Sequence, residues 1–181
     1  MVVKVGGSLY DLPDLGPRLW GFLVALDEPG WLVVPGGGAA VDAIRALDRD
    51  HALGPGPAHW LALRACSVNA HFLLELLPGS ELVADPRAHT GPGVLDPFAF
   101  AQGDEGRPGC LPHRWEATSD SLAARAAELA RAELVLLKSV TIPPDASWET
   151  AAAAGHVDPL FPALVRRAGL SVRAVNLRDW P

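Results

Sequence analysis

The sequence lacks the features that would tie the chain to a nucleic acid or a membrane. Its 181 residues carry a net charge of −6, and no basic stripe runs along it, which argues against a nucleic-acid or anionic-membrane binder. No apolar run approaches the roughly 18 to 20 residues of a membrane span, and the N-terminus lacks the basic flank and apolar core of a signal peptide. We therefore expect a cytoplasmic protein with no nucleic-acid partner and no membrane partner.

Cysteine is also scarce. Only Cys66 and Cys110 occur, far apart and outside any CxxC pattern, so neither a disulfide framework nor a zinc site is indicated. A chain of this length fits one domain, 1–181, and it can bury most of its apolar surface without disulfides or a structural metal. We expect no metal ion held by protein side chains.

Apolar runs alternate with helical patterns along the chain. The run 2–5 ends at two glycines, and the run 31–34 ends at a proline and three glycines, as is typical of buried parallel strands. The expected strands are 2–5, 31–34, 81–84, 133–137 and 171–175, and the expected helices are 12–26, a helix beyond the glycines at 36–38, 58–77, a helix opening at 118, and 158–168. This alternation predicts an α/β domain with a mainly parallel central sheet.

One long segment resists assignment. Residues 85–112 are rich in glycine and proline, with a single apolar island at 94–100. The periodicity of this island fits a strand and a substrate-facing loop equally well, so both alternatives stay open.

Glycines and charged residues gather where ligands bind in such folds, outside the carboxyl ends of the strands. Gly6-Gly7 and Gly36-Gly37-Gly38 each lie between a strand end and a helix start, where N–H groups can approach an anion with no Cβ in the way. Lys4 and Lys138 bring positive charge to the same edge. Asp120, at a predicted helix start, could hold these lysines in position.

Taken singly, each of these features has an ordinary structural explanation. Two glycines after a strand most often form a tight turn, a lysine at a strand end is usually solvated, and Asp120 alone would be a helix cap. Their joint occurrence favours an anion site, and phosphoryl transfer needs such groups because its catalysis is mostly positioning and charge stabilisation. The GxxxxGK[ST] and GxGxxG fingerprints are both absent, which argues against a P-loop kinase or a Rossmann dehydrogenase.

Four motifs in order resemble those of the amino acid kinase superfamily, which includes the acetylglutamate, aspartate, uridylate and isopentenyl phosphate kinases. The motifs are KVGGS at 4–8, VPGGG at 34–38, TSDSLAA at 118–124 and LLK at 136–138. The resemblance implies a three-layer αβα sandwich and ATP-dependent phosphorylation of a small acceptor that carries a phosphate monoester or a carboxylate. It also divides the single domain into a mainly acceptor-binding segment (1–117) and a nucleotide-binding segment (118–181).

The resemblance implies a role for each motif residue. Lys4 and Lys138 would flank the transferred phosphoryl group as catalytic residues, with Asp120 organising them and Mg²⁺ bridging the phosphates of ATP. The residues implied to hold phosphate and acceptor are Gly6, Gly7, Ser8, Gly36, Gly37, Gly38 and His59, and those implied to bind the nucleotide are Lys138, Ser139 and Asp158. Members of the family commonly pair through the long helix, here 58–77, so a homo-oligomer is implied as well.

Within the superfamily, the likeness is nearest to the small archaeal and methylotroph enzymes that phosphorylate the aminomethylfuran phosphate precursor of methanofuran. It rests on AHW at 58–60, on LPH at 111–113 with Trp115, and on TSDS at 118–121. It implies that His59 meets the acceptor phosphate, although a partly buried helix residue would look the same. His113, Arg114 and Trp115 would line the same pocket or form a surface loop.

The chain departs from the larger kinases after the second lysine. In place of an Asp-Gly-Val type loop, Lys138 is followed by SVTIPP at 139–144, and only about forty residues remain, so the nucleotide-binding segment is reduced. Asp158 could partly replace the missing loop or could cap a helix. Two alternatives to a methanofuran-type kinase therefore remain: a uridylate-kinase-like nucleotide kinase, which the short chain and lack of an evident base pocket disfavour, and a non-catalytic nucleotide- or anion-binding member of the fold.

Overall fold

Six parallel strands form the centre of the molecule. The computed structural model describes residues 1–181. The strands are β1 (Val2–Val5), β2 (Trp31–Pro35), β3 (Glu81–Val83), β4 (Pro92–Leu95), β5 (Leu134–Lys138) and β6 (Val172–Asn176), and their order across the sheet is β3-β4-β2-β1-β5-β6. Every neighbouring pair is parallel. The predicted α/β fold is confirmed, with a sheet that is parallel throughout.

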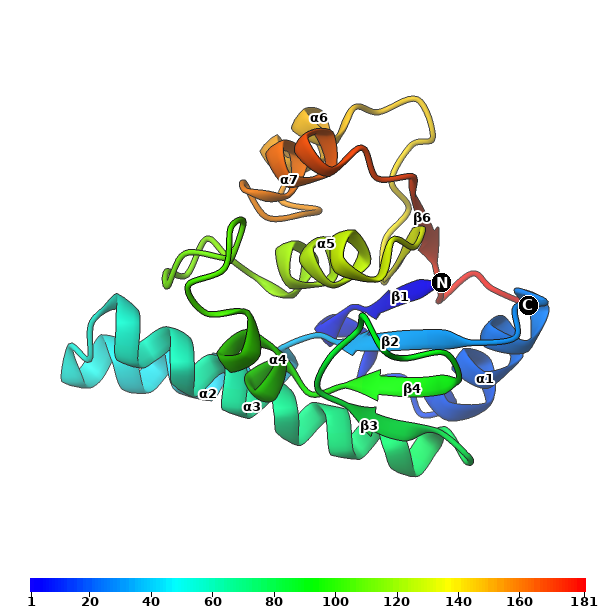
Figure 1. The fold of residues 1–181 in the computed structure, drawn as a ribbon, viewed down its shortest axis with the longest axis horizontal. Helices are drawn as coiled ribbons and strands as arrows, with labels where there is room; N and C mark the ends of the chain where they lie inside the picture. The colour runs from blue at the N-terminus through cyan, green and yellow to red at the C-terminus, as the bar shows by residue number, and fades with distance from the viewer.

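Helices cover both faces of the sheet, which gives the three layers. The helices α5 (Ser119–Ala130), α6 (Trp148–Ala153) and α7 (Phe161–Ala168) lie above the strands in Figure 1, and α1 (Leu15–Ala25) and α3 (Pro55–Leu76) lie on the other side. Successive strand residues point to opposite faces, so each face has its own core. Val2 packs in the core under α5 and α7, whereas Val3 and Val5 pack in the core with α1 and the C-terminal half of α3.

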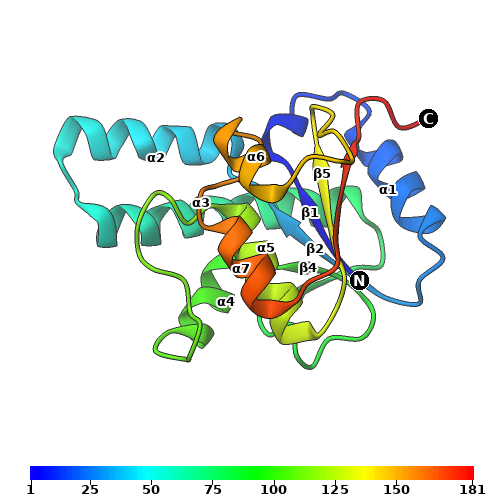
Figure 2. The same ribbon diagram turned by 90° about the horizontal axis from the view of Figure 1, so that it is seen from above.

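A helical pair extends the molecule beyond the sheet. Helix α2 (Gly38–His51) starts at the carboxyl end of β2 and runs outward, and α3 returns beside it (Figure 2). Between them the backbone turns through Ala52 and Gly54, whose φ angles are +50° and +84°. Pro55 then occupies the first position of α3, where its missing N–H costs no hydrogen bond. No helix in the structure has the combined length and apolar character that crossing a bilayer requires.

Three segments differ from the sequence predictions. The apolar island at 94–100 is neither a single strand nor a loop: β4 ends at Leu95, and α4 (Pro97–Asp104) begins two residues later. Asp96 causes the switch, because its side chain accepts hydrogen bonds from two amides of the first turn of α4. The first predicted helix starts later, at Leu15, after a short 3₁₀ turn η1 (Gly7–Leu9). Helix α6 was not predicted.

Candidate functional site

Two lysines and one aspartate meet at the carboxyl end of the two central strands. Lys4 lies on β1 and Lys138 on the neighbouring β5, and Asp120 is the second residue of α5. The Lys4 Nζ is 2.9 Å from Asp120 Oδ1, and the Lys138 Nζ is 2.8 Å from each oxygen of the same carboxylate. All three residues are at most 8% exposed. The structure therefore brings the three predicted catalytic residues together in one cluster, the Lys4–Asp120–Lys138 triad.

Burial and mutual attraction set the charges of this triad. Burial acts to raise the pKa of Asp120, but the two ammonium groups outweigh it and hold that pKa below its usual value. Burial and, after it, the nearby Lys4 charge lower the pKa of Lys138 to about 8, against the opposing effect of Asp120. With both lysines protonated, the triad has two ammonium groups and one carboxylate, and so one net positive charge. This charge suits the site to an anion.

A polar cavity of about 750 Å³ lies over the triad. The side chains of Ser8 and Ser139 meet at its rim, with their Oγ atoms 2.7 Å apart, and so join the turns that follow β1 and β5. The other lining residues come from the same strand ends, from the start of α5 and from the segment before α7: Gly6, Gly7, Trp115, Glu116, Thr118, Val140, Gly155, His156, Val157, Asp158 and Pro159.

The two glycine turns are in direct contact. A Cβ on Gly7 would lie 2.2 Å from the Gly38 nitrogen, and a Cβ on Gly36 would lie 2.3 Å from the Gly7 nitrogen, so neither position accepts a side chain. The Gly6 amide donates to the carbonyl of Leu137 at 2.8 Å and extends the pairing of β1 with β5. Gly6 therefore lets the backbone pass close to β5, and its own N–H is bonded to Leu137 rather than offered to a ligand.

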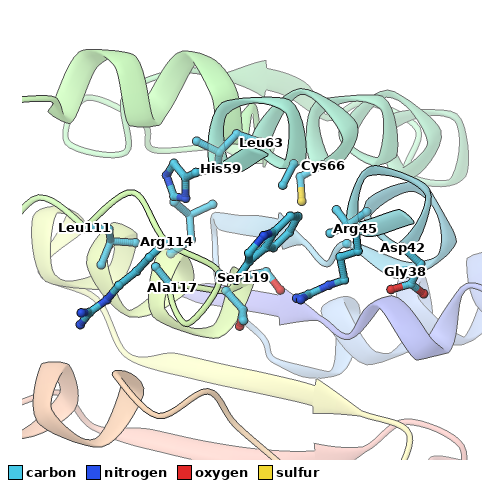
Figure 3. Close-up of a pocket in the computed structure, with 16 residues that line it drawn as sticks. Gly38, Asp42, Arg45, His59, Leu63, Cys66, Leu111, Arg114, Ala117 and Ser119 are labelled. Atoms are coloured by element: carbon cyan, nitrogen blue, oxygen red, sulfur yellow. The ribbon is translucent and has the colours of Figure 1, made fainter. Parts of the chain in front are cut away.

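A second, smaller cavity of about 180 Å³ adjoins the first, and Trp115 and Thr118 line both. Figure 3 shows its walls: His59, Leu63 and Cys66 on α3, Gly38, Asp42 and Arg45 on α2, and Leu111, Arg114, Ala117 and Ser119 on the opposite side. Gly37 also lines it. The structure thus places the predicted acceptor residues Gly37, Gly38 and His59 around one space.

His59 is a buried, neutral residue of this wall. Its ring stacks on that of His113, with centroids 4.9 Å apart and planes 19° from parallel. Burial, followed by the charge of His113, lowers the pKa of His59 to about 4. At neutral pH His59 can therefore donate or accept a hydrogen bond, but it carries no positive charge toward an acceptor.

Trp115 forms the partition between the two cavities. Its Nε1 donates to Asp48 Oδ2 at 2.7 Å, and the guanidinium carbon of Arg45 lies 4.3 Å from the centre of its ring. Both partners are on α2, so the loop between α4 and α5 is attached to that helix. The sequence left two alternatives for this loop, a pocket wall and a surface loop. Arg114 and Trp115 line the smaller cavity, whereas His113 stacks on His59.

Asp158 organises the start of α5. Its carboxylate accepts six hydrogen bonds, which come from the amide and hydroxyl of Thr118, the amide and hydroxyl of Ser121, and the amides of Leu160 and Phe161. These bonds hold residues on both sides of Asp120 and delay the start of α7 to Phe161. Asp158 lines the polar cavity, but its geometry is that of the helix cap considered from the sequence, with its oxygens bonded to the chain itself.

Sequence reasoning missed Asn69 and Tyr10, which anchor the second glycine turn. Asn69, on α3, donates to the carbonyls of Gly36 and Gly37 at 2.8 and 2.7 Å, and the Tyr10 hydroxyl donates to the Gly36 carbonyl at 3.0 Å. The available signal was an asparagine, a poor helix former, inside an otherwise apolar stretch of a long helix.

Comparison with known proteins identifies the fold. No family model and no curated protein matches the chain. The solved structure of uridylate kinase from Archaeoglobus fulgidus superposes with a TM-score of 0.67 at 15% identity, over 97% of this chain and 90% of that one. The chain has the fold of the uridylate kinases. UMP kinase from Bacillus anthracis agrees, with a TM-score of 0.66 at 12% identity over 98% and 87% of the two chains. This is the amino acid kinase fold that the four sequence motifs predicted.

Proposed function

We propose that the protein is an ATP-dependent phosphotransferase that moves the γ-phosphoryl group to a small anionic acceptor. The observation that carries this proposal is the Lys4–Asp120–Lys138 triad, buried at the ends of adjacent strands and open to a polar cavity. The smaller cavity beside it offers a separate space for an acceptor. A donor site and an acceptor site that share a wall are what direct transfer between two small molecules requires.

The triad explains how the chain would lower the barrier. An acceptor oxygen forms a bond to the γ-phosphorus while the bond to the bridging oxygen of ADP breaks, and charge builds on the migrating group. The ammonium groups of Lys4 and Lys138 stabilise that charge, and Asp120 fixes their positions. Loss of one such preorganised donor costs on the order of 3 to 4 kcal/mol in the transition state.

Magnesium fits this site as a partner of the nucleotide. No group of three or more His, Cys, Asp and Glu side chains gathers to hold a metal ion, and the Asp158 oxygens are bonded to the chain. The phosphates of ATP would supply ligands to Mg²⁺, as is usual for this ion, and Mg²⁺ would neutralise some of their charge. Lys138, Ser139 and Asp158 remain the residues proposed for the nucleotide side.

For the acceptor we propose a phosphate monoester, with an aminomethylfuran phosphate of the methanofuran type as the leading candidate. The smaller cavity supports a compact, partly apolar molecule: it combines apolar side chains such as Leu63 with the neutral His59 and with Arg45, whose guanidinium lies over the Trp115 ring. The indole of Trp115 offers a flat wall for a small ring.

In the assembled protein, we propose pairing of two chains through α3.

A nucleotide acceptor is the second candidate. It is favoured by one observation, the fold that the chain shares with two uridylate kinases. A non-catalytic protein that binds a nucleotide or small anion is the third, and it is favoured by the short segment after Lys138.

Calorimetry and a coupled assay separate these candidates. Titration with ATP and Mg²⁺ should give saturable binding, and a coupled ADP-release assay should then respond to one acceptor class among aminomethylfuran phosphate, UMP, isopentenyl phosphate and amino acids. Activity on UMP alone would replace the furan acceptor by a nucleotide. Saturable ATP binding with no turnover on any acceptor would favour the non-catalytic protein, and absence of ATP binding would refute the kinase.

Variants of the triad tie any activity to the proposed residues. Lys4→Met and Asp120→Asn should each lower kcat by roughly a hundredfold or more. The first removes a cation that stabilises the migrating group, and the second removes the carboxylate that holds both ammonium groups in place. Arg49→Met is the matched control, because it also removes one positive charge but changes an exposed residue that pairs only with Asp50. Its kcat should equal that of the unaltered protein.

A further inference from the structure

Asn69 lies buried beneath the second glycine turn and bonds to two consecutive peptide groups of that turn. Both hydrogen bonds come from its Nδ2, at 2.8 Å to the Gly36 carbonyl and 2.7 Å to the Gly37 carbonyl, and the residue is 8% exposed. The Tyr10 hydroxyl supports the Gly36 carbonyl from a second direction at 3.0 Å. A single side-chain amide thus fixes the orientation of two successive peptide planes.

The orientation of the carbonyls also decides where the amides point. In a trans peptide the N–H is directed opposite to the C=O, and no cis peptide bond occurs in the chain. Because the Gly36 and Gly37 carbonyls face Asn69, the amides of Gly37 and Gly38 point away from the Asn69 side chain. Both glycines line the smaller cavity.

The backbone conformation makes these two amides converge. Gly37 is right-handed helical, with φ −76° and ψ −50°, and Gly38 follows with a φ of +51°. A right-handed residue followed by a left-handed one directs successive N–H groups into one concavity that suits an anion. Gly38 also packs against Gly7, which lines the polar cavity beside Lys4, so this concavity lies where the two cavities meet.

We propose that Asn69 is a positioning residue for acceptor binding: it holds the amides of Gly37 and Gly38 in the orientation that receives the anionic group of the acceptor. The identification of that anion with the acceptor rests on the proposed function. The geometry itself assigns only the ligand chemistry, a phosphate monoester or a similar small oxyanion. Asn69 would touch no substrate and would act through the turn.

Methyl phosphate is the probe for this role, because it carries the anionic group without an assumed acceptor. Asn69→Ala should raise the Kd for methyl phosphate, measured by calorimetry, by tenfold or more, because the carbonyls of the turn lose their shared donor. Asn69→Asp should do at least as much, because its carboxylate would face two carbonyl oxygens. Asn69→Ser is the milder variant should the others fail to fold, and Tyr10→Phe should raise the Kd only a few-fold, since Asn69 still holds both carbonyls.

Ser67→Ala separates positioning from general damage to α3. The Ser67 hydroxyl lies two residues before Asn69 on the same helix and bonds to Asp96 and to the Leu63 carbonyl, away from the glycine turn. Ser67→Ala should lower Tm and leave the Kd for methyl phosphate unchanged. The Asn69 variants should raise the methyl phosphate Kd, and the KM of any acceptor found, while the Kd for ATP stays within twofold.

Three results would overturn the inference: no binding of methyl phosphate by the unaltered protein, an unchanged Kd in the Asn69 variants, or an increase that Ser67→Ala reproduces. Failure of the proposed function has a different signature. In that case ATP and Mg²⁺ do not bind or no acceptor turns over, while methyl phosphate still binds and still depends on Asn69.

Discussion

Lys4 and Lys138 are the only lysines in the chain, and both bond to the same carboxylate. Thirteen arginines carry the remaining basic charge, mostly at the surface and in ordinary ion pairs. Lysine offers a compact ammonium whose pKa responds to burial, whereas arginine stays charged. The chain therefore places both of its lysines at one point, and the protonation of Lys138, whose pKa burial lowers, decides how much positive charge the site holds.

The activity should fall as the pH rises through about 8. Burial lowers the pKa of Lys138 to about 8 from its ordinary 10.5, so the positive charge that would stabilise the migrating phosphoryl group is lost above that pH. With only two lysines, lysine-selective isotope labelling should give two side-chain NMR signals, and a Lys138→Met variant assigns one of them. That signal should titrate near pH 8, in step with the pH profile of kcat.

Stability should respond in the opposite direction. Between pH 8 and 10.5 the unfolded chain holds the Lys138 proton more tightly than the folded chain does. The contribution of Lys138 therefore increases the free energy of unfolding as the pH rises across that window. A Lys138 signal that titrated near 10.5 would show that burial does not control this group.

The sequence predicted the triad but not Asn69, and the difference is physical. Lys4, Asp120 and Lys138 follow strand ends or open a helix, and parallel topology brings all such positions to one edge of the sheet. Asn69 is in the middle of a helix, where its neighbours in the chain reveal nothing about which backbone carbonyls it will meet. Only the packing of α3 under the glycine turn shows its partners.

At the scale of elements, the start of α5 depends on a residue that follows it by nearly forty positions. Asp158 accepts bonds from Thr118 and Ser121, and so sets the first turn of α5 around Asp120. The sequence predicted a helix start at 118 and considered Asp120 as its cap, but in the structure the cap is Thr118, whose side chain accepts from the Asp120 amide. The second support, from Asp158, was not predicted from the sequence, because Asp158 belongs to the loop before another helix.

Replacing Asp158 should cost both stability and activity. Asp158→Ala leaves six donors without their acceptor, several of them buried, and should lower the free energy of unfolding by about 3 kcal/mol, or Tm by roughly 6 to 12 °C for a chain of this size. Thermal unfolding followed by circular dichroism measures the change. The activity should fall as well, because Asp120 loses the turn that positions it.

Ser147→Ala provides the comparison for that variant. Ser147 caps α6 by accepting from the Thr150 amide and bonds to no residue of the triad, and its loss should cost only about 1 kcal/mol with no change in kcat. Equal effects of the two substitutions on stability and activity would mean that Asp158 is an ordinary helix cap with no particular role in positioning Asp120.

At the scale of the whole molecule, the two segments suggested by the sequence share one sheet. Strand β1, in the segment 1–117, pairs with β2 on one side and on the other with β5, which belongs to the segment 118–181. The C-terminal residues return to the first segment: Trp180 packs edge-on against Phe22. Alternation of apolar runs was enough to predict the sheet, but not the strand order that puts β5 beside β1, because strand neighbours are set by long-range packing.

This arrangement predicts that the chain unfolds as one unit. Removal of 118–181 would take away one neighbour of β1 and expose Val2, Leu32 and Val34, which pack under α5 and α7. A 1–117 fragment should therefore give the NMR spectrum of an unfolded chain, with narrow chemical-shift dispersion. In the intact protein, hydrogen exchange at rising urea should release the amides of β2 and β5 at the same concentration, because neither strand keeps its core without the other. Release of β5 while β2 stays protected would instead divide the protein into two independently folding units, and the triad would then join units that can separate.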